Sequence, residues 1–216
     1  GHKSWLDSGY YGGLTFYLSP RRNALLNLRS YGLNEGINEV IATTISGVEK
    51  PNAAPIGLSV KRGKVTARIY KKTATFKNLL GTKALIANIV DDPLLFVITA
   101  FSDLSKKQYC YKKNLKLPVL KQASAWILFN CKVIEDSDPA RVALYPEKGE
   151  VIAKKVIAVN RGLFAVIEAT IHATRYKATG EERYRELIEH YRAIVQKCGR
   201  GRDKIAFAKL EKFMGE

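Results

Sequence analysis

The chain has 216 residues, 46% of them hydrophobic and 26% charged, and its 36 lysines and arginines against 20 aspartates and glutamates give a net charge of +16. This length can bury one large hydrophobic core, and the composition excludes a disordered chain. The longest apolar runs, such as residues 94–101, are much shorter than the roughly 20 residues that cross a bilayer, so we expect no membrane segment.

The N-terminal third is predicted to change from an irregular arm to extended strands. Residues 1–32 are rich in Gly, Tyr and Ser and carry one short helical pattern at 23–28, so we assign them as an N-terminal arm. β-branched residues at 39–45, a Ser-Gly turn and a further extended stretch at 52–60 predict a β-hairpin.

The middle of the chain is predicted to be mainly extended, with one short helix. Residues 64–70 alternate between apolar and polar side chains, as a half-buried strand does. A Thr followed by a helical pattern, stopped by a Gly, predicts a helix of one or two turns over 73–81. We expect two more strands at 84–90 and 94–101, separated by an Asp-Asp-Pro turn, and another at 123–135.

The last third has helical patterns. Apolar residues are dense over 160–176, have helical spacing over 181–197, and continue in a short stretch at 203–213. Five or six short strands with tight turns favour a barrel or sandwich, and with the helices they predict an α+β fold, which we take as an antiparallel β-barrel with an appended helical segment. We divide the chain after the arm into a barrel domain at 33–150 and a helical subdomain at 151–216 that packs on the barrel.

Residues 71–78, Lys-Lys-Thr-Ala-Thr-Phe-Lys-Asn, are a candidate anion site. The N-terminus of a helix presents unpaired N–H groups and a partial positive charge. The hydroxyl and ammonium groups that a phosphate monoester requires are supplied by Thr73, Thr75, Lys71, Lys72 and Lys77. An ordinary helix cap with surface lysines is the alternative interpretation, and the residues alone do not decide between the two.

A second candidate is the stretch at 51–57, Pro-Asn-Ala-Ala-Pro-Ile-Gly. Small side chains let a flat ligand approach the backbone closely, and a Pro within a strand marks an edge or a break in pairing because it has no N–H to donate. An ordinary edge strand has the same pattern, so this stretch does not identify a ligand by itself.

Four segments in their order along the chain resemble an archaeal family of uncharacterised proteins, the domain of unknown function 447, which has the FMN-binding split-barrel fold. The segments are Glu39-Val-Ile-Ala-Thr-Thr, Pro51-Asn-Ala-Ala-Pro-Ile-Gly, the Thr-x-Lys-Asn-Leu pattern within 70–80, and Ala87-Asn-Ile-Val-Asp-Asp-Pro-Leu-Leu-Phe. Residues 160–175 are similar to the helical C-terminal segment of that family. The resemblance covers residues 33–205 and leaves the arm, residues 1–32, outside.

The resemblance implies a split β-barrel that binds FMN as a homodimer, with the cofactor near the subunit interface. The residues implied to hold the flavin phosphate are Thr73, Thr75, Lys77 and Asn78. Those implied to lie against the isoalloxazine ring are Asn52, Ala53, Ala54, Pro55 and Ile56, with Asn88 as a further candidate.

The predicted helix at 160–176 contains a polar set made of Asn160, Arg161, Glu168, His172 and Arg175. Arg161, Glu168 and Arg175 are spaced by seven and lie on nearly one face, while Glu168 and His172 are an i,i+4 pair. One interpretation is a buried ion-pair network that ties the helix to the barrel. The other places Arg161, His172 or Arg175 beside a substrate of the flavin. We expect no metal site, because neither His190 nor the cysteines offer matching spacing.

We therefore predict an FMN-binding flavoprotein, an oxidoreductase of the flavin reductase kind whose substrate and redox partner the sequence does not name. No nucleophile elbow, P-loop, Rossmann fingerprint or HExxH motif is present, which leaves hydrolase, kinase and dehydrogenase classes with little support. Two alternatives remain: a non-catalytic protein that binds a flavin or another phosphate ligand, and a nucleic-acid-binding β-barrel, which the charge permits but the even spread of basic residues does not favour. Cysteines without CxxC spacing and the lack of a signal-peptide pattern predict a cytoplasmic protein.

Overall fold

The computed structural model describes residues 26–215. The elements in chain order are η1 (Leu28–Tyr31), β1 (Gly36–Ile45), β2 (Pro51–Lys61), β3 (Lys64–Ile69), α1 (Ala74–Thr82), β4 (Ala84–Ile89), α2 (Pro93–Phe101), η2 (Lys106–Gln108), β5 (Tyr109–Cys110), β6 (Val119–Leu120), β7 (Ala125–Glu135), β8 (Ala140–Val151), α3 (Arg161–Thr179), α4 (Glu182–Cys198) and α5 (Gly201–Met214). Residues 1–25 of the predicted arm, with the start of its helical pattern, lie outside the described residues; within the described part, η1 begins where that pattern ends.

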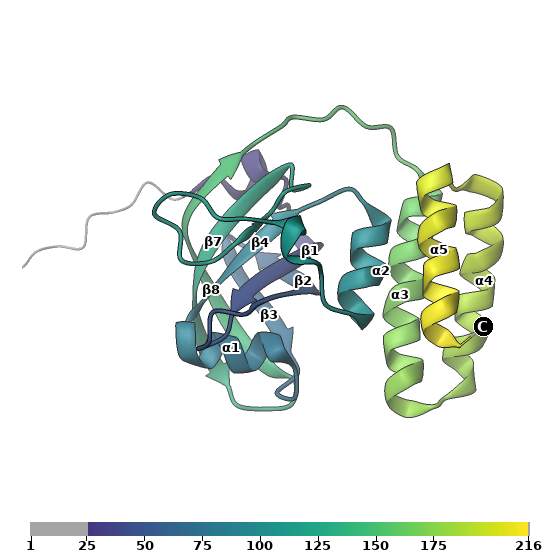
Figure 1. Cartoon of the computed structure of the whole chain (residues 1–216), viewed down its shortest axis with the longest axis horizontal. Coiled ribbons are helices and arrows are strands. Elements are labelled where there is room, and N and C mark those ends of the chain that lie inside the picture. Colours follow the sequence, from purple (N-terminus) through teal and green to yellow (C-terminus); the bar gives the residue numbers. More distant parts are fainter. Residues whose placement is uncertain (1–25, 216) are drawn as a thin grey trace, which may run out of the picture.

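Six strands form a closed antiparallel barrel in the order β1-β2-β3-β8-β7-β4, and Figure 1 shows α3, α4 and α5 standing beside it. The predicted hairpin is present: β1 and β2 pair along their length, from Gly36 opposite Val60 to Ile45 opposite Pro51. The predicted α+β fold, a barrel with an appended helical segment, is confirmed.

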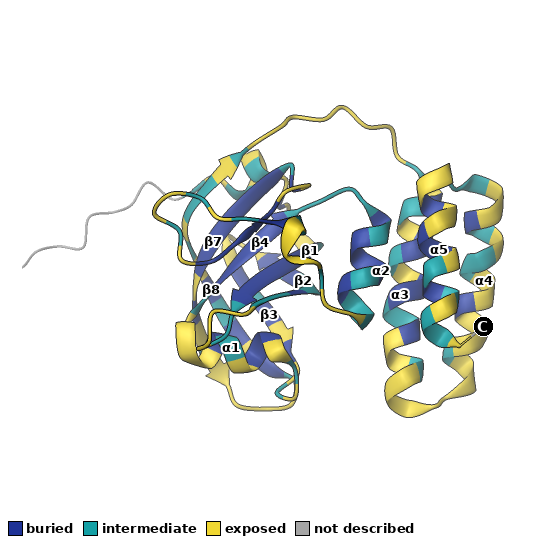
Figure 2. Cartoon of the chain, in the orientation of Figure 1, coloured by how far each residue is buried: buried dark blue, intermediate teal, exposed yellow. Residues whose placement is uncertain are grey.

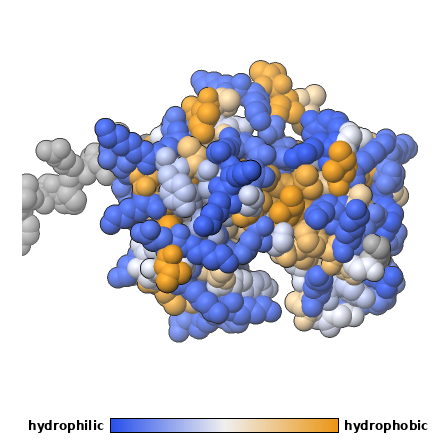
Figure 3. Space-filling view, in the orientation of Figure 1, coloured by the Kyte–Doolittle hydropathy of each residue, from blue (hydrophilic) through white to orange (hydrophobic). Residues whose placement is uncertain are grey.

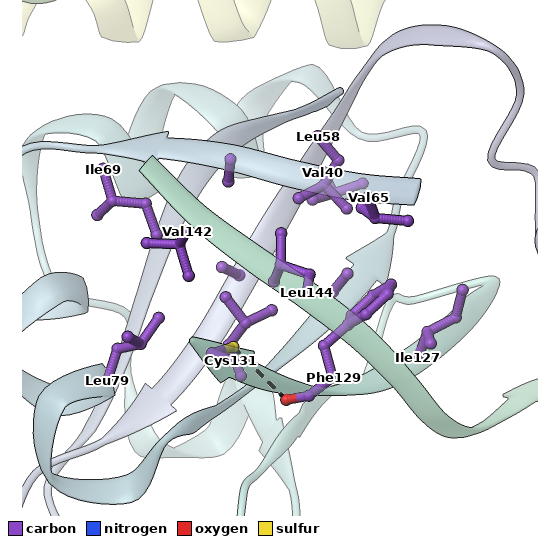
Figure 4. Packing of buried hydrophobic residues seen from close by; sticks show 14 of the residues in the cluster. Val40, Leu58, Val65, Ile69, Leu79, Ile127, Phe129, Cys131, Val142 and Leu144 are labelled. Carbon is purple, nitrogen blue, oxygen red and sulfur yellow. Dashed lines mark hydrogen bonds between the residues drawn. The ribbon is translucent and has the colours of Figure 1, made fainter. Parts of the chain in front are cut away.

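One face of each strand fills the barrel. Because side chains alternate across a strand, every second residue points inward, and the inward residues form one apolar cluster that Figure 4 shows around Val142, Leu144 and Phe129. Helix α1 closes one end of the barrel with Phe76 and Leu79, which belong to the same cluster. The first turn of α1 is therefore anchored to the barrel wall.

The segment predicted as a strand at 94–101 is the helix α2, so that prediction is wrong. The side chain of Asp92 accepts a hydrogen bond from the backbone N–H of Leu94 (3.0 Å), and Pro93 occupies the first helical position. The Asp-Asp-Pro sequence thus starts a helix, as an acidic cap followed by proline often does. A short apolar run does not distinguish a buried strand from a buried helix.

Helix α2 is apolar all round because it lies between the barrel and the C-terminal helices. Leu95 and Phe96 belong to the cluster on the outer face of the barrel, and Val97 belongs to the cluster of the C-terminal helices. Figure 2 shows how little of α2 is exposed. The helix therefore joins the two apolar clusters.

The 12-residue strand β8 is missing from the sequence-based assignment, which places no strand after 123–135. Its first residues alternate between buried Ala140, Val142 and Leu144 and exposed Arg141 and Tyr145. The pattern of a half-buried strand is thus in the sequence. β8 completes the barrel by pairing with both β3 and β7.

The three C-terminal helices form where the helical patterns predict them. Asn160 caps α3 by accepting hydrogen bonds from the backbone N–H groups of Gly162 and Leu163. Gly162 lies so close to the end of α4 that a Cβ on it would be 2.3 Å from the Cα of Gly199. No helix within residues 26–215 combines the length and the apolar character that a membrane span requires.

Candidate functional site

The predicted anion site lies at the N-terminus of α1. Thr73 caps the helix: its hydroxyl accepts a hydrogen bond from the backbone N–H of Phe76 (3.2 Å) and donates one to the carbonyl of Tyr70 (2.7 Å). The backbone N–H groups of Ala74 and Thr75 make no hydrogen bond to any described residue, as expected in the first turn of a helix. The free donors at this terminus are therefore backbone groups, because the Thr73 hydroxyl is used within the turn.

A polar network of four side chains lies beside this terminus. The hydroxyl of Thr44, at the end of β1, accepts hydrogen bonds from the amides of Asn78 (3.1 Å) and Asn52 (3.4 Å), and Asn52 also donates to the hydroxyl of Thr75 (3.1 Å). Thr44 and Thr75 are buried. The network joins β1, β2 and α1, and so fixes the helix terminus relative to the strands.

Thr44 ends the segment Glu39-Val-Ile-Ala-Thr-Thr quoted above, but it is not among the site residues predicted from the sequence. It is the second-last residue of β1 and lies opposite Asn52 in the register of β1 and β2. Only that register, together with the position of α1, brings it to Asn78. The one signal in the sequence is a pair of threonines that follows the apolar run Val40-Ile-Ala in β1.

The lysines near the helix terminus differ in what they contact. The ammonium of Lys71 pairs with Asp136 (2.6 Å), and its backbone N–H donates to Asp138 (3.1 Å), so this residue holds the turn between β7 and β8. Lys72 and Lys77 are exposed and form no ion pair with a described residue. The unpaired positive charge near this terminus, among the described lysines at 71, 72 and 77, therefore comes from Lys72 and Lys77, in addition to the helix dipole.

The first half of β2 has a free edge. β2 pairs with β1 from Pro51 to Lys61, but with β3 only from Leu58 to Lys61, so residues 51–57 have a neighbouring strand on one side alone. Pro55, which lacks an N–H, lies in this stretch, as a proline at a strand edge does. Backbone N–H and C=O groups along this edge are open to a ligand.

The residues predicted to lie against a flat ring do not share one face of β2. Asn52, Ala54 and Ile56 point into the barrel: Asn52 joins the polar network, and Ile56 packs against the barrel core. Ala53 and Pro55 point outward, and Ala53 is covered by the apolar cluster that includes α2. A ligand on the outer face can therefore touch the side chain of Pro55 and the free edge.

Asn88 lies fully buried on β4. Its amide nitrogen donates to the carbonyl of Ile41 (2.9 Å) and the hydroxyl of Thr43 (3.1 Å), and its amide oxygen accepts from the backbone N–H of Leu120 (2.8 Å). These bonds hold the segment before β7 onto β1 and β4. The structure thus gives Asn88 a supporting place in the barrel wall.

The polar residues of α3 do not form a buried ion-pair network, so that interpretation is wrong. Arg161 and Arg175 are exposed. Within the described part of the chain, the ion-pair contact of Glu168 is with His172, at 4.0 Å, and the Glu168 side chain is half exposed. Long charged side chains at a helix surface remain in water in the absence of a buried partner.

His172 and Arg175 face α4 rather than the barrel. The ring of His172 stacks between Tyr184 and Tyr191, with centroid distances of 5.9 and 5.8 Å, and the guanidinium of Arg175 lies over Tyr184 at 6.0 Å. Burial and, secondly, the charge of Arg175 lower the pKa of His172, which keeps the ring neutral at pH 7. Among residues 26–215 no group of three or more His, Cys, Asp and Glu side chains is arranged to hold a metal ion.

Two family models match the chain. The model of the N-terminal domain of DUF447, a protein of unknown function, matches residues 38–153, which include the end of α1 and the edge of β2 described above. The second DUF447 model matches residues 160–212, the three C-terminal helices. Both matches begin after the predicted N-terminal arm.

Solved structures of similar shape include flavin-binding proteins. The FMN-bound protein MM1853 from Methanosarcina mazei is 42% identical with a TM-score of 0.81, over 87% of this chain and 100% of that chain. The flavin reductase component BorF of a bacterial tryptophan halogenase is 12% identical (TM-score 0.47, 59% of this chain and 88% of that chain), and the flavin reductase HpaC complexed with NADP+ is 14% identical (TM-score 0.47, 60% and 88%). Likenesses as distant as the last two support no statement about this chain.

Proposed function

The chain belongs to the DUF447 family, and we propose on this premise that it binds FMN, with the phosphate at the N-terminus of α1 and the ring along the free edge of β2. The predicted family and the split-barrel fold are confirmed. The observation that carries the proposal is the FMN bound by the 42% identical M. mazei protein. The unpaired backbone N–H groups at the α1 terminus, beside a strand edge without a partner strand, support it.

The helix terminus fits a phosphate through backbone groups and lysines. The N–H groups of Ala74 and Thr75 are free, and the exposed Lys72 and Lys77 lie on the same first turn or just before it. Together they supply the hydrogen bonds and the positive charge that a phosphate dianion requires.

The polar side chains around the terminus hold it in place. Thr73, Thr75, Asn52 and Asn78 are already hydrogen-bonded to protein groups, and we assign them the role of keeping the α1 terminus and the β2 edge at a fixed separation. Asn88 supports β1 from the outer face of the barrel, where it bonds Ile41 and the backbone of Leu120. Fixed donors of this kind bind an anion without a large cost of reorganisation.

FMN supplies the redox chemistry when it is bound, and the protein positions the flavin. This chain presents the backbone groups of residues 51–57 to the polar edge of the ring, and Pro55 as an apolar contact beside it. The reaction class that we propose is an oxidoreductase of the flavin reductase kind. A non-catalytic flavin-binding protein is the alternative. Anaerobic mixing of the FMN-loaded protein with NADH, NADPH and a reduced deazaflavin separates the two. Bleaching of the flavin by one of these donors supports the enzyme, and bleaching by none of them supports the alternative.

We also propose that the protein is a homodimer. The linker at 152–159 between β8 and α3 carries large apolar side chains that are 46–105% exposed, those of Ile152, Val156, Ile157 and Val159. Figure 3 shows apolar residues on the crest of the molecule where this linker runs. Apolar side chains gathered on one exposed segment are typical of a surface that binds another protein. Light scattering should give twice the mass of one chain, and Val156→Asp with Val159→Asp should give a single chain.

The proposal is tested by comparing FMN with riboflavin, which has the same ring but no phosphate. Fluorescence titration of the purified protein should show FMN binding, with riboflavin at least about tenfold weaker because it loses the charge-assisted bonds at the α1 terminus. Equal affinities for the two flavins would refute the phosphate assignment at α1. The absence of binding of either flavin would refute the proposed function.

A further inference from the structure

A cleft of about 310 Å³ separates the barrel from the C-terminal helices. Its walls come from β1, from α2 and the segment before it, and from α3, and they include Ile37, Glu39, Val90, Phe96, Phe164 and Glu168. A cleft of this volume is large enough for a small organic molecule. None of these residues belongs to the phosphate site at α1.

The apolar part of the cleft is open to water. Ile37 and Phe164 are 76% and 53% exposed, although both line the cleft together with the buried Phe96. Large apolar side chains that line a concave surface are typical of a ligand site rather than of a solvated face. The cleft thus offers two aromatic rings and an aliphatic wall to a ligand.

The polar part of the cleft carries negative charge without a matching cation. Glu39 is half-buried and forms no hydrogen bond or ion pair with any described residue. Glu168 contacts His172 at 4.0 Å, and that ring is neutral at pH 7. Burial and the charge of Glu168 raise the pKa of Glu39, as expected for two carboxyl groups that face the same apolar space. A cation between them would remove this repulsion.

We propose that this cleft binds a small molecule that combines an apolar body with a protonated amine. The amine lies between Glu39 and Glu168, and the body lies against Ile37, Phe96 and Phe164. The carboxylates provide charge-assisted hydrogen bonds, and the aromatic faces add a favourable contact with a cation. The negative charges of both glutamates repel an anion of the same size from the cleft.

The cleft adjoins the strand that we assign to the flavin. Glu39 and Ile37 lie directly over Gly57, where a Cβ would be 3.2 Å from the carboxylate oxygen of Glu39 and 3.2 Å from a methyl of Ile37. Gly57 and Pro55 point to the same side of β2 and are two residues apart, which is about 7 Å along a strand. The bound amine would therefore lie beside the proposed flavin site, a placement that rests on the proposed function, whereas binding of the amine to the cleft does not.

The test uses benzylammonium, benzyl alcohol and benzoate, which share one ring and differ in charge. Binding to the full chain is followed by nuclear magnetic resonance shifts, both with FMN and after its removal. We expect benzylammonium to bind at least about tenfold more tightly than benzyl alcohol, and benzoate not to bind. Glu39→Gln should remove the advantage of the cation, and Phe164→Ala should weaken both benzylammonium and benzyl alcohol.

Glu186→Gln is the matched control, because Glu186 is exposed on α4, a helix that contributes no residue to the cleft lining given above; it should change nothing. Glu168→Gln gives a second variant at a half-exposed position should Glu39→Gln fail to fold. Benzyl alcohol binding as tightly as benzylammonium, an unchanged preference in both glutamine variants, or no binding of any probe would each overturn the proposal. If the protein binds benzylammonium but does not take up FMN, the result would support the cleft proposal and refute the proposed function.

Discussion

The amide of Asn52, at the start of β2, donates a 3.1 Å hydrogen bond to the hydroxyl of Thr75 in the first turn of α1. This bond connects the open strand edge to the helix terminus, the two features that we assign to the ring and the phosphate of one cofactor. Asn52 also donates to Thr44, which in turn accepts from Asn78. A substitution at Asn52 should therefore affect both the proposed phosphate site and the proposed ring site.

We expect Asn52→Ala to lower FMN affinity by about tenfold and to lower the free energy of unfolding by about 1 kcal/mol, because it leaves the buried Thr75 hydroxyl with one bond fewer. Fluorescence titration and urea unfolding measure the two effects. Asn130→Ala is the control: Asn130 is exposed and donates to Glu147 on the barrel surface, so FMN affinity should not change. An Asn52→Ala variant with wild-type affinity would mean that the network does not position the cofactor.

Lys77→Ala should weaken FMN binding by about fivefold to tenfold, since it removes an exposed positive charge next to the proposed phosphate. Because exposed charges are screened by salt, the difference between variant and wild type should shrink between low and high ionic strength. Lys204→Ala, which removes an exposed lysine of α5, should leave the affinity as it is. Riboflavin binding, which involves no phosphate, should be the same in all three proteins.

The stacked position of His172 predicts a loss of stability in acid. Burial, with a further contribution from Arg175, lowers the pKa of His172 in the folded chain below the ordinary histidine value of about 6.5, so the unfolded chain takes up the proton first. Stability should therefore be full above about pH 6.5 and fall as the pH drops through and below that value. Thermal unfolding between pH 5 and 8 should show this loss in the wild type and a smaller loss in His172→Phe. His190→Phe, at an exposed position, should keep the wild-type dependence.

Gly162→Ala should destabilise the helical segment by about 2–4 kcal/mol, because the new Cβ would be 2.3 Å from the backbone of Gly199 and neither helix end can move without disturbing its cap. Gly201→Ala is the matched control, since a Cβ at Gly201 meets no atom within 4 Å. Chemical unfolding of both variants measures the difference. Equal stabilities would show that the ends of α3 and α4 are not closely packed.

Local signals in the sequence predict the elements that are determined by nearby residues, such as a cap at the start of a helix or alternating side chains along a strand. The Thr73 cap and the alternation in β3 are of this kind, and both elements form where they are expected. Helix α2 differs because its apolar run reflects burial between two layers, and only the layers decide whether such a run is a strand or a helix. The cap at Asp92 does indicate the start of a helix, but an Asp followed by Pro is also typical of turns.

The candidate site is predicted in part for the same reason. Thr73 and Pro55 have local roles, at a helix cap and in a strand edge, and the structure places them there. Thr44 and Glu39 matter through what the barrel register and the packing of α3 bring beside them, and no local pattern describes those neighbours. His172 is in the expected helix but faces α4, because a seven-residue spacing groups residues on a face without saying which neighbour that face meets.

The central claim is that one FMN spans the terminus of α1 and the free edge of β2. A crystal structure of this protein grown with FMN tests it most directly. The account predicts phosphate oxygens within hydrogen-bond distance of the backbone N–H groups of Ala74 and Thr75, with the ring edge against residues 51–57. Flavin density elsewhere on the molecule, with this terminus bound only to water, would contradict it.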